Sequence, residues 1–117
     1  MLLMPTNLKV LLNRYPVDMR KSINGLSIIV SDALGLDPTS NHLFVFRNKR
    51  GDKIKILYWN KNGFCLWYKR LERERFKFPG VCNDCVEITT QQLNWLLDGL
   101  DFIRLKGHST LNYSRYF

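Results

Sequence analysis

Residues 42–71 read HLFVFRNKRGDKIKILYWNKNGFCLWYKRL, three apolar runs separated by two groups of turn-forming residues. The groups are Asn48-Lys49-Arg50-Gly51 and Lys61-Asn62-Gly63, and the Asn-Gly pair of the second is a strong hairpin signal. The pattern predicts strands over His42–Arg47, Lys53–Trp59 and Phe64–Leu71. Because short connections join antiparallel neighbours, these strands are expected to form an antiparallel meander.

Segments before the meander predict a strand and a helix. Leu8–Leu12 is expected to be a short strand. The carboxylate of Asp18 is expected to cap a helix that runs to about Leu34, because it can accept from free N–H groups of the first turn. Gly35 suits the left-handed position that ends a helix.

Segments after the meander predict two short strands and a second helix. The strands are expected at Arg75–Phe78 and Val86–Ile88. Thr89 and Gln92 have capping-box spacing and open a helix with a leucine face. The fold class is therefore α+β: a small antiparallel β-sheet with one helix packed on its apolar face and a C-terminal helix. We expect a single domain over residues 1–105 and a tail over 106–117.

The chain has 117 residues and a net charge of +8, and the whole excess lies between Arg47 and Lys77. Such a localised basic field attracts polyanions, and nucleic acid is the commonest of them in the cytosol. No run approaches the roughly 18 apolar residues of a membrane span, and the first residues lack the pattern of a signal peptide. Three cysteines fit a reducing compartment. These features predict a cytoplasmic protein that does not enter a membrane.

Alternation along the central strands sorts their side chains between two faces. One face is expected to be apolar and to receive the first helix. Its residues are Phe44, Phe46, Ile54, Ile56, Tyr58, Phe64, Leu66 and Tyr68. The other face is expected to mix cations with two indoles. Its residues are Val45, Arg47, Lys53, Lys55, Leu57, Trp59, Cys65, Trp67 and Lys69.

A mixed face of this kind fits nucleic acid, because aromatic rings stack on bases and flanking cations neutralise phosphates. The alternative is that Trp59 and Trp67 are buried under the second helix or a partner. Around the end of the last central strand lie Arg70, Arg73, Arg75 and Lys77. These cations are expected to form either a phosphate-contact strip or local ion pairs with Glu72 and Glu74, which lie between them. The predicted nucleic-acid-binding residues are Arg20, Lys21, Arg47, Lys49, Arg50, Lys53, Lys55, Trp59, Trp67, Lys69, Arg70, Arg73 and Arg75. The residues leave open DNA against RNA and single against double strands.

Other chemistries are weakly supported. Cys82 and Cys85 form a lone C-x-x-C, whereas a structural zinc site needs four ligands. There is no glycine-rich phosphate loop and no nucleophile or zinc-protease motif. Asp18 and Asp52 are better explained by cap and turn roles than as a pair of metal-binding carboxylates. We therefore predict no catalytic residues, no metal and no cofactor.

A series of short motifs runs through most of the chain, from about Leu8 to Asp101. In order they are Asp18-Met19-Arg20-Lys21, Gly25-Leu26, Leu43-Phe44-Val45-Phe46-Arg47, Asp52, Ile54-Lys55, Leu57, Trp59, Gly63, Lys69-Arg70-Leu71-Glu72, Arg75-Phe76 and Leu93-x-x-Leu96-Leu97-x-Gly99-Leu100-Asp101. This series resembles the TnpB-type accessory proteins encoded by the second reading frame of bacterial insertion sequences of family sixty-six. The chain departs from that pattern at Asn60 and Glu74.

The resemblance implies a small bacterial protein that assists transposition beside a DDE-type transposase, which carries the catalytic carboxylates. It implies DNA and that transposase as partners, and a non-enzymatic role in DNA recombination. The alternative is a protein-interaction adaptor, in which Leu57, Trp59 and Trp67 form an apolar patch that docks the transposase or a second copy of the chain.

Overall fold

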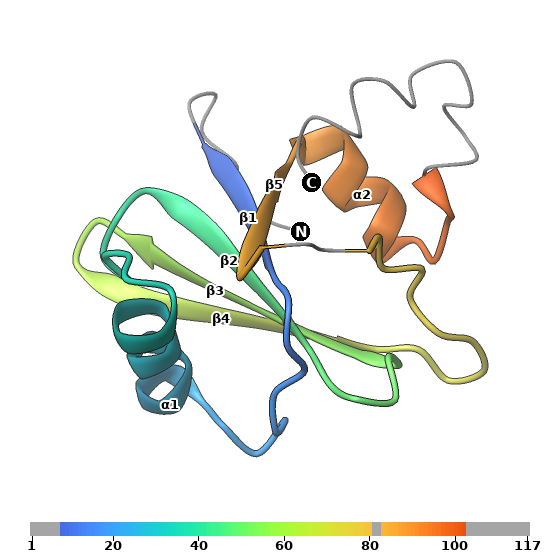
Figure 1. The fold of residues 1–117 in the computed structure, drawn as a ribbon, viewed down its shortest axis with the longest axis horizontal. Helices are drawn as coiled ribbons and strands as arrows, with labels where there is room; N and C mark the ends of the chain where they lie inside the picture. Colours follow the sequence, from blue (N-terminus) through green and yellow to red (C-terminus); the bar gives the residue numbers. More distant parts are fainter. Residues whose placement is uncertain (1–7, 81–82, 103–117) are drawn as a thin grey trace.

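The computed structural model of the chain describes residues 8–80 and 83–102. The elements in order are β1 (Lys9–Asn13), α1 (Ile23–Ile28), a π-helical turn η1 (Ile29–Ala33), β2 (His42–Arg47), β3 (Lys53–Asn60), β4 (Gly63–Arg70), β5 (Cys85–Ile88) and α2 (Thr90–Leu97). The strands form one five-stranded sheet in the order β4-β3-β2-β1-β5 (Figure 1). The predicted α+β class and the β2–β3–β4 meander are confirmed. The strand expected over Leu8–Leu12 forms as β1, but the expected antiparallel sheet is mixed, because β1 pairs parallel with β2 and antiparallel with β5.

The two helices pack on opposite faces of the sheet. In β2, Phe44 lies in an apolar cluster with Leu26 of α1, whereas the next residue, Val45, lies in a second cluster with Leu93 of α2. Successive side chains of a strand point to opposite faces, so the two clusters lie on opposite sides. The sheet is therefore the middle of three layers, with α1 and α2 far apart in Figure 1.

The register between β2 and β3 differs from the predicted one. Phe44 lies opposite Leu57 and Val45 lies opposite Ile56, so each pair shares a face. The prediction had placed Ile56 with Phe44, and it is wrong by one residue along β3. Such a slip exchanges the two faces of a strand. Lys55 and Leu57 therefore lie on the α1 side, and Ile54 and Ile56 lie on the α2 side.

The first helix is shorter than predicted. It begins at Ile23 after Ser22, so Asp18 is not its cap. Instead, the Asp18 carboxylate accepts from the backbone N–H of Arg20 at 2.9 Å and shapes a turn before the helix. The predicted left-handed glycine is confirmed, because Gly35 has φ of +66° directly after the helical segment.

The C-terminal elements largely follow the prediction. Thr89 Oγ1 accepts from Gln92 N at 3.0 Å, and Thr89 N donates to Gln92 Oε1 at 2.9 Å, which completes the capping box. The strand predicted at Arg75–Phe78 does not form; Phe76 N donates to Gly51 O at 2.8 Å instead. The predicted tail, 106–117, lies outside the described residues, and the domain boundary stays a prediction. Among the described residues, no helix has the length and apolarity needed to cross a membrane.

Candidate nucleic-acid interface

Strand direction brings the basic residues to one end of the sheet. β1, β2 and β4 end there and β3 begins there, so Arg14, Arg47, Lys53 and Arg70 stand near one another. We call this the basic end. Its cations are Arg14, Arg20, Lys21, Arg47, Lys49, Arg50, Lys53, Lys55, Lys69, Arg70, Arg73, Arg75 and Lys77. Among the described basic residues, only Lys9 and Lys61 lie at the opposite end.

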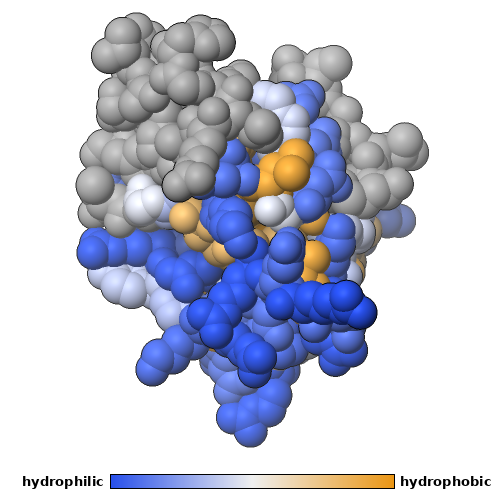
Figure 2. Space-filling view, turned by 90° about the vertical axis from the view of Figure 1, so that its right-hand side faces the viewer, coloured by the Kyte–Doolittle hydropathy of each residue, from blue (hydrophilic) through white to orange (hydrophobic). Residues whose placement is uncertain are grey.

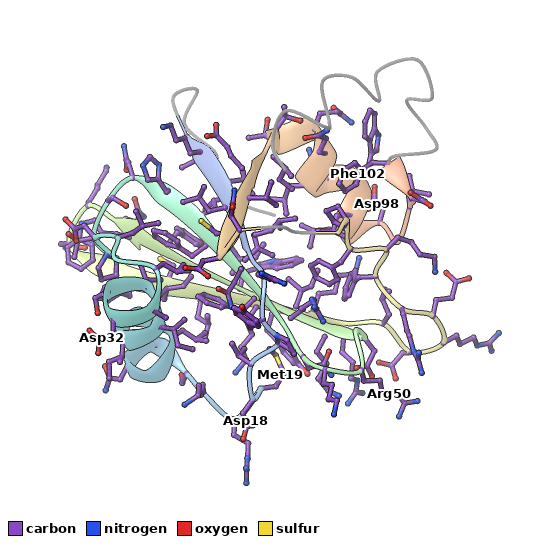
Figure 3. All side chains as sticks on the ribbon, viewed as in Figure 1. Asp18, Met19, Asp32, Arg50, Asp98 and Phe102 are labelled. Atoms are coloured by element: carbon purple, nitrogen blue, oxygen red, sulfur yellow. The ribbon has the colours of Figure 1, made fainter. Side chains whose placement is uncertain are left out.

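Backbone hydrogen bonds gather three segments at the basic end. Val17 N donates to Arg47 O at 2.8 Å, which ties the loop after β1 to the end of β2. Leu71 N donates to Asp52 O, also at 2.8 Å, which ties the segment after β4 to the β2–β3 turn. The basic end lies at the lower right of Figure 1, and hydrophilic side chains cover the lower half of the view in Figure 2, which faces that side. Figure 3 labels Arg50 at the lower right, on the β2–β3 turn.

The side chain of Asn48 organises the β2–β3 turn. Its Oδ1 accepts from Gly51 N at 2.9 Å and Lys53 N at 3.1 Å, while its Nδ2 donates to Asp52 at 2.7 Å. The last bond lowers the pKa of Asp52 below its ordinary value. Gly51 has φ of +83°, a conformation that side chains rarely adopt. The turn thus holds Lys49 and Arg50 outward and exposed.

Two lysines of the predicted site are hydrogen-bonded to backbone carbonyls of other segments. Lys55 Nζ donates to Met19 O and Lys21 O, both at 2.8 Å, and so fixes the loop before α1. Lys69 Nζ donates to Leu97 O at 2.7 Å, where a cation also suits the C-terminus of α2. Both ammonium groups therefore hold structural elements together.

Ion pairs engage some of the other cations. Arg20 lies 2.7 Å from the Asp18 carboxylate, and its hydrogen bonds lower the pKa of Asp18 to about 2. Arg70 lies 2.9 Å from Glu72, which raises the pKa of the guanidinium. Of the two alternatives for the cations after the last central strand, local ion pairing is therefore the one observed for Arg70.

Among the described residues, three exposed cations in the β2–β3 turn and the segment after β4 make neither an ion pair nor a side-chain hydrogen bond to another residue. Lys49, Arg73 and Arg75 are exposed and make no ion pair within residues 8–80 and 83–102. They come from the β2–β3 turn and from the segment after β4, which the backbone bonds hold together. These are the side chains best placed to meet phosphate groups.

The predicted mixed face is not formed, because the two indoles lie on opposite sides of the sheet. Trp59 is paired with Phe64 on the α1 side, and the two rings meet edge to face at 5.0 Å. Trp67 is paired with Ile56 and packs against the cluster under α2. The alternative of burial under the second helix therefore holds for Trp67.

Sequence reasoning missed one functional candidate at the basic end, Arg14. Its place depends on the parallel pairing of β1 with β2, which brings the end of β1 beside Arg47. Arg47 Nη2 donates to Arg14 O at 3.2 Å, and the Arg47 guanidinium lies 5.3 Å from the centre of the Phe78 ring. Partial burial lowers the pKa of Arg47. No pattern within the chain signals this contact.

The acidic and cysteine residues give little support for a metal centre. Within the described part of the chain, no three His, Cys, Asp or Glu side chains gather as a metal site would require. Cys82, one half of the C-x-x-C, lies outside that part. Burial raises the pKa of the Cys85 thiol, which disfavours the thiolate form that binds metals.

The fold and its basic end define a small α+β protein in which two helices sandwich a mixed sheet and the cations collect at the strand ends. The chain belongs to the IS66 Orf2 like protein family, which it matches over residues 8–107. This confirms the predicted family and connects the chain with transposition of IS66-type insertion sequences as an accessory protein.

Two relatives come from Sinorhizobium fredii. The chain is 37% identical to uncharacterized protein y4jC over 85% of both chains. It is 35% identical to uncharacterized protein y4hO over 82% of this chain and 84% of that protein. No solved structure matches the chain.

Proposed function

We propose that the protein binds DNA through its basic end and thereby helps the transposase to assemble on the ends of the insertion sequence. The observation that carries this proposal is the convergence of cations from the loop after β1, the β2–β3 turn and the segment after β4. Side chains from separate segments that share one charge sign create a field that attracts a polyanion. The proposed role is non-catalytic, and the hydrogen bonds of Asp18 with Arg20 and of Asp52 with Asn48 support structural roles for these two carboxylates.

The proposal narrows the predicted set of nucleic-acid-binding residues. Lys49, Arg73 and Arg75 are assigned phosphate contacts, with Arg50, Lys53 and Arg70 beside them. Trp59 is not assigned base stacking, because it is already packed edge to face on Phe64.

Fluorescence anisotropy with a labelled duplex of the element end tests the proposal. If about six phosphates are contacted, affinity falls roughly a thousandfold between about 50 and 200 mM salt. The double variant Lys49→Glu, Arg73→Glu is expected to weaken binding and to lower the salt slope by about 1 for each lost contact. The matched control Lys9→Glu, Lys61→Glu changes the net charge equally at the opposite end and is expected to bind far more tightly than that variant.

Equal weakening by the two double variants would refute the basic end as the site, because only net charge would then matter. An unrelated duplex and a single strand, titrated in parallel, report which form of DNA is preferred. Binding that is absent at low salt would overturn DNA binding altogether.

The adaptor alternative was based on an apolar patch of Leu57, Trp59 and Trp67, and these side chains do not form a common patch. Leu57 is fully buried in the cluster under α1, and the two indoles lie on opposite faces of the sheet. The transposase contact in our proposal therefore does not use that patch. Size-exclusion chromatography of the protein with the transposase, with and without DNA, tests whether assembly depends on DNA.

A further inference from the structure

A pocket opens at the basic end between the loop after β1 and the residues that precede Gly80. Its volume is about 280 Å³. It is lined by Asn13, Arg14, Tyr15, Pro16, Arg47, Phe78, Pro79 and Gly80. This volume is just below the range of about 300–1,000 Å³ for drug-sized ligands, so it suits a group about as large as one nucleobase.

Hydrogen bonds hold the loop that forms one wall of the pocket. Arg14 N donates to Asp84 O at 2.9 Å, and Val17 N donates to Arg47 O at 2.8 Å. Between these anchors, Asn13 Nδ2 donates to Tyr15 O at 2.8 Å. The wall is thus preorganised, which lowers the entropic cost of binding.

The side chains in the pocket combine an aromatic ring with cations. Tyr15 is 55% exposed, which is unusual for a large ring and leaves a face for stacking. The Arg14 guanidinium lies 5.1 Å from the centre of that ring, and Arg47 forms part of the facing wall. Among the described residues that line the pocket there is no carboxylate, so its charged side chains, Arg14 and Arg47, both attract a phosphate.

We propose that this pocket takes one unpaired nucleotide at the end of a DNA duplex. The base stacks on Tyr15, and Arg14 and Arg47 face its phosphate. Bases inside a duplex are stacked and paired, so only an end or an unpaired position can supply such a group without the cost of flipping. This inference rests on the proposed DNA binding and adds recognition of the strand end to it.

The test compares a blunt duplex with duplexes that carry a short unpaired extension at the 3′ or the 5′ end. Tyr15→Leu is expected to weaken binding of one extended duplex about fivefold or more, the lower range for loss of one base–aromatic stack. Blunt-duplex binding is expected to change by less than about twofold. Tyr68→Leu is the control, because Tyr68 is 48% exposed but outside the pocket. Circular dichroism verifies that both variants fold.

A second readout uses 2-aminopurine as the unpaired base, whose fluorescence is expected to be quenched by the wild type and not by Tyr15→Leu. If blunt and extended duplexes bind equally well, or Tyr15→Leu weakens both equally, the pocket proposal is overturned while DNA binding stands. If no duplex binds at low salt, the proposed function itself has failed.

Discussion

Lys55 has its charge at the basic end, yet its ammonium group donates to two backbone carbonyls. The acceptors are Met19 O and Lys21 O, each at 2.8 Å, in the loop that leads into α1. The change Lys55→Met removes the charge and both bonds while keeping an unbranched side chain of similar length. It therefore separates an anchoring role for Lys55 from a DNA-contact role.

The expected loss of stability follows from the two bonds. A hydrogen bond to a charged group contributes roughly 1.5–3 kcal/mol. The bond to Met19 O is partly buried, whereas the bond to Lys21 O is exposed and contributes less. We therefore expect Lys55→Met to lower the free energy of unfolding by about 2 kcal/mol. For a domain of about 100 residues, this lowers Tm by about 8 °C.

Thermal unfolding followed by circular dichroism measures that shift, with Lys53→Met as the control. Lys53 makes an ion pair with Asp52 at 3.5 Å, between partly buried side chains, and we expect the loss of that contact to lower the unfolding free energy by about 1 kcal/mol or less. At a temperature where both variants are folded, DNA affinity of Lys55→Met is expected to fall less than about threefold, since salt screens one charge beyond ~8 Å. The anchoring role would be refuted if Lys55→Met melts like the wild type and its DNA affinity falls about tenfold or more.

Three further predictions concern stability. Thr89→Ala removes the capping box and is expected to lower the unfolding free energy by about 1 kcal/mol, whereas Thr90→Ala, one residue later, is not; thermal melts compare them. Leu57→Ala is expected to cost roughly 2–5 kcal/mol in urea unfolding, because Leu57 is fully buried; a neutral effect would revive Leu57 as a docking residue. The pKa of Asp18 is about 2 when folded, below its ordinary 3.8, so its contribution to stability is present above about pH 4 and lost as pH falls toward 2. Urea titrations between about pH 4 and 2 measure the unfolding free energy, which is expected to fall less with pH in Asp18→Asn than in the wild type. If both fall equally, the bond between Asp18 and Arg20 does not form in solution.

Local signals in the sequence predicted most of the elements because each has a local physical cause. The turns around Gly51 and Asn62 delimit the meander, and the Thr89 capping box opens α2 where expected. Asp18 misled the prediction of the first helix, because a carboxylate that can cap a helix can equally close a turn onto Arg20. Nothing local could reveal the parallel pairing of β1 with β2, which depends on a crossover through α1.

The two faces of the meander could not be assigned from alternation, because helices cover both of them. A strand with one solvated face alternates clearly, but β3 has apolar residues on both sides, with Ile54 and Ile56 under α2 and Leu57 under α1. The register was therefore fixed by the β2–β3 turn rather than by the strand pattern. The same slip separated Trp59 from Trp67 and removed the predicted stacking face.

Packing of helices on both faces also supports our proposal that DNA binds at the strand ends and not on a face of the sheet. A sheet that reads bases on its flat face must leave that face open, and here α1 packs on one face over β3 and β4, while α2 packs on the other face over β1. A polyanion then meets the loops at the ends of the strands. Among the cations there, Lys55 and Lys69 donate to backbone carbonyls, and Arg20 and Arg70 form ion pairs. Lys49, Arg73 and Arg75 are exposed and make neither kind of contact within the described part of the chain. Charge clustering in the sequence thus marks the region that we propose for DNA binding, and hydrogen bonding in the fold narrows the set of its cations that we assign to phosphate contacts.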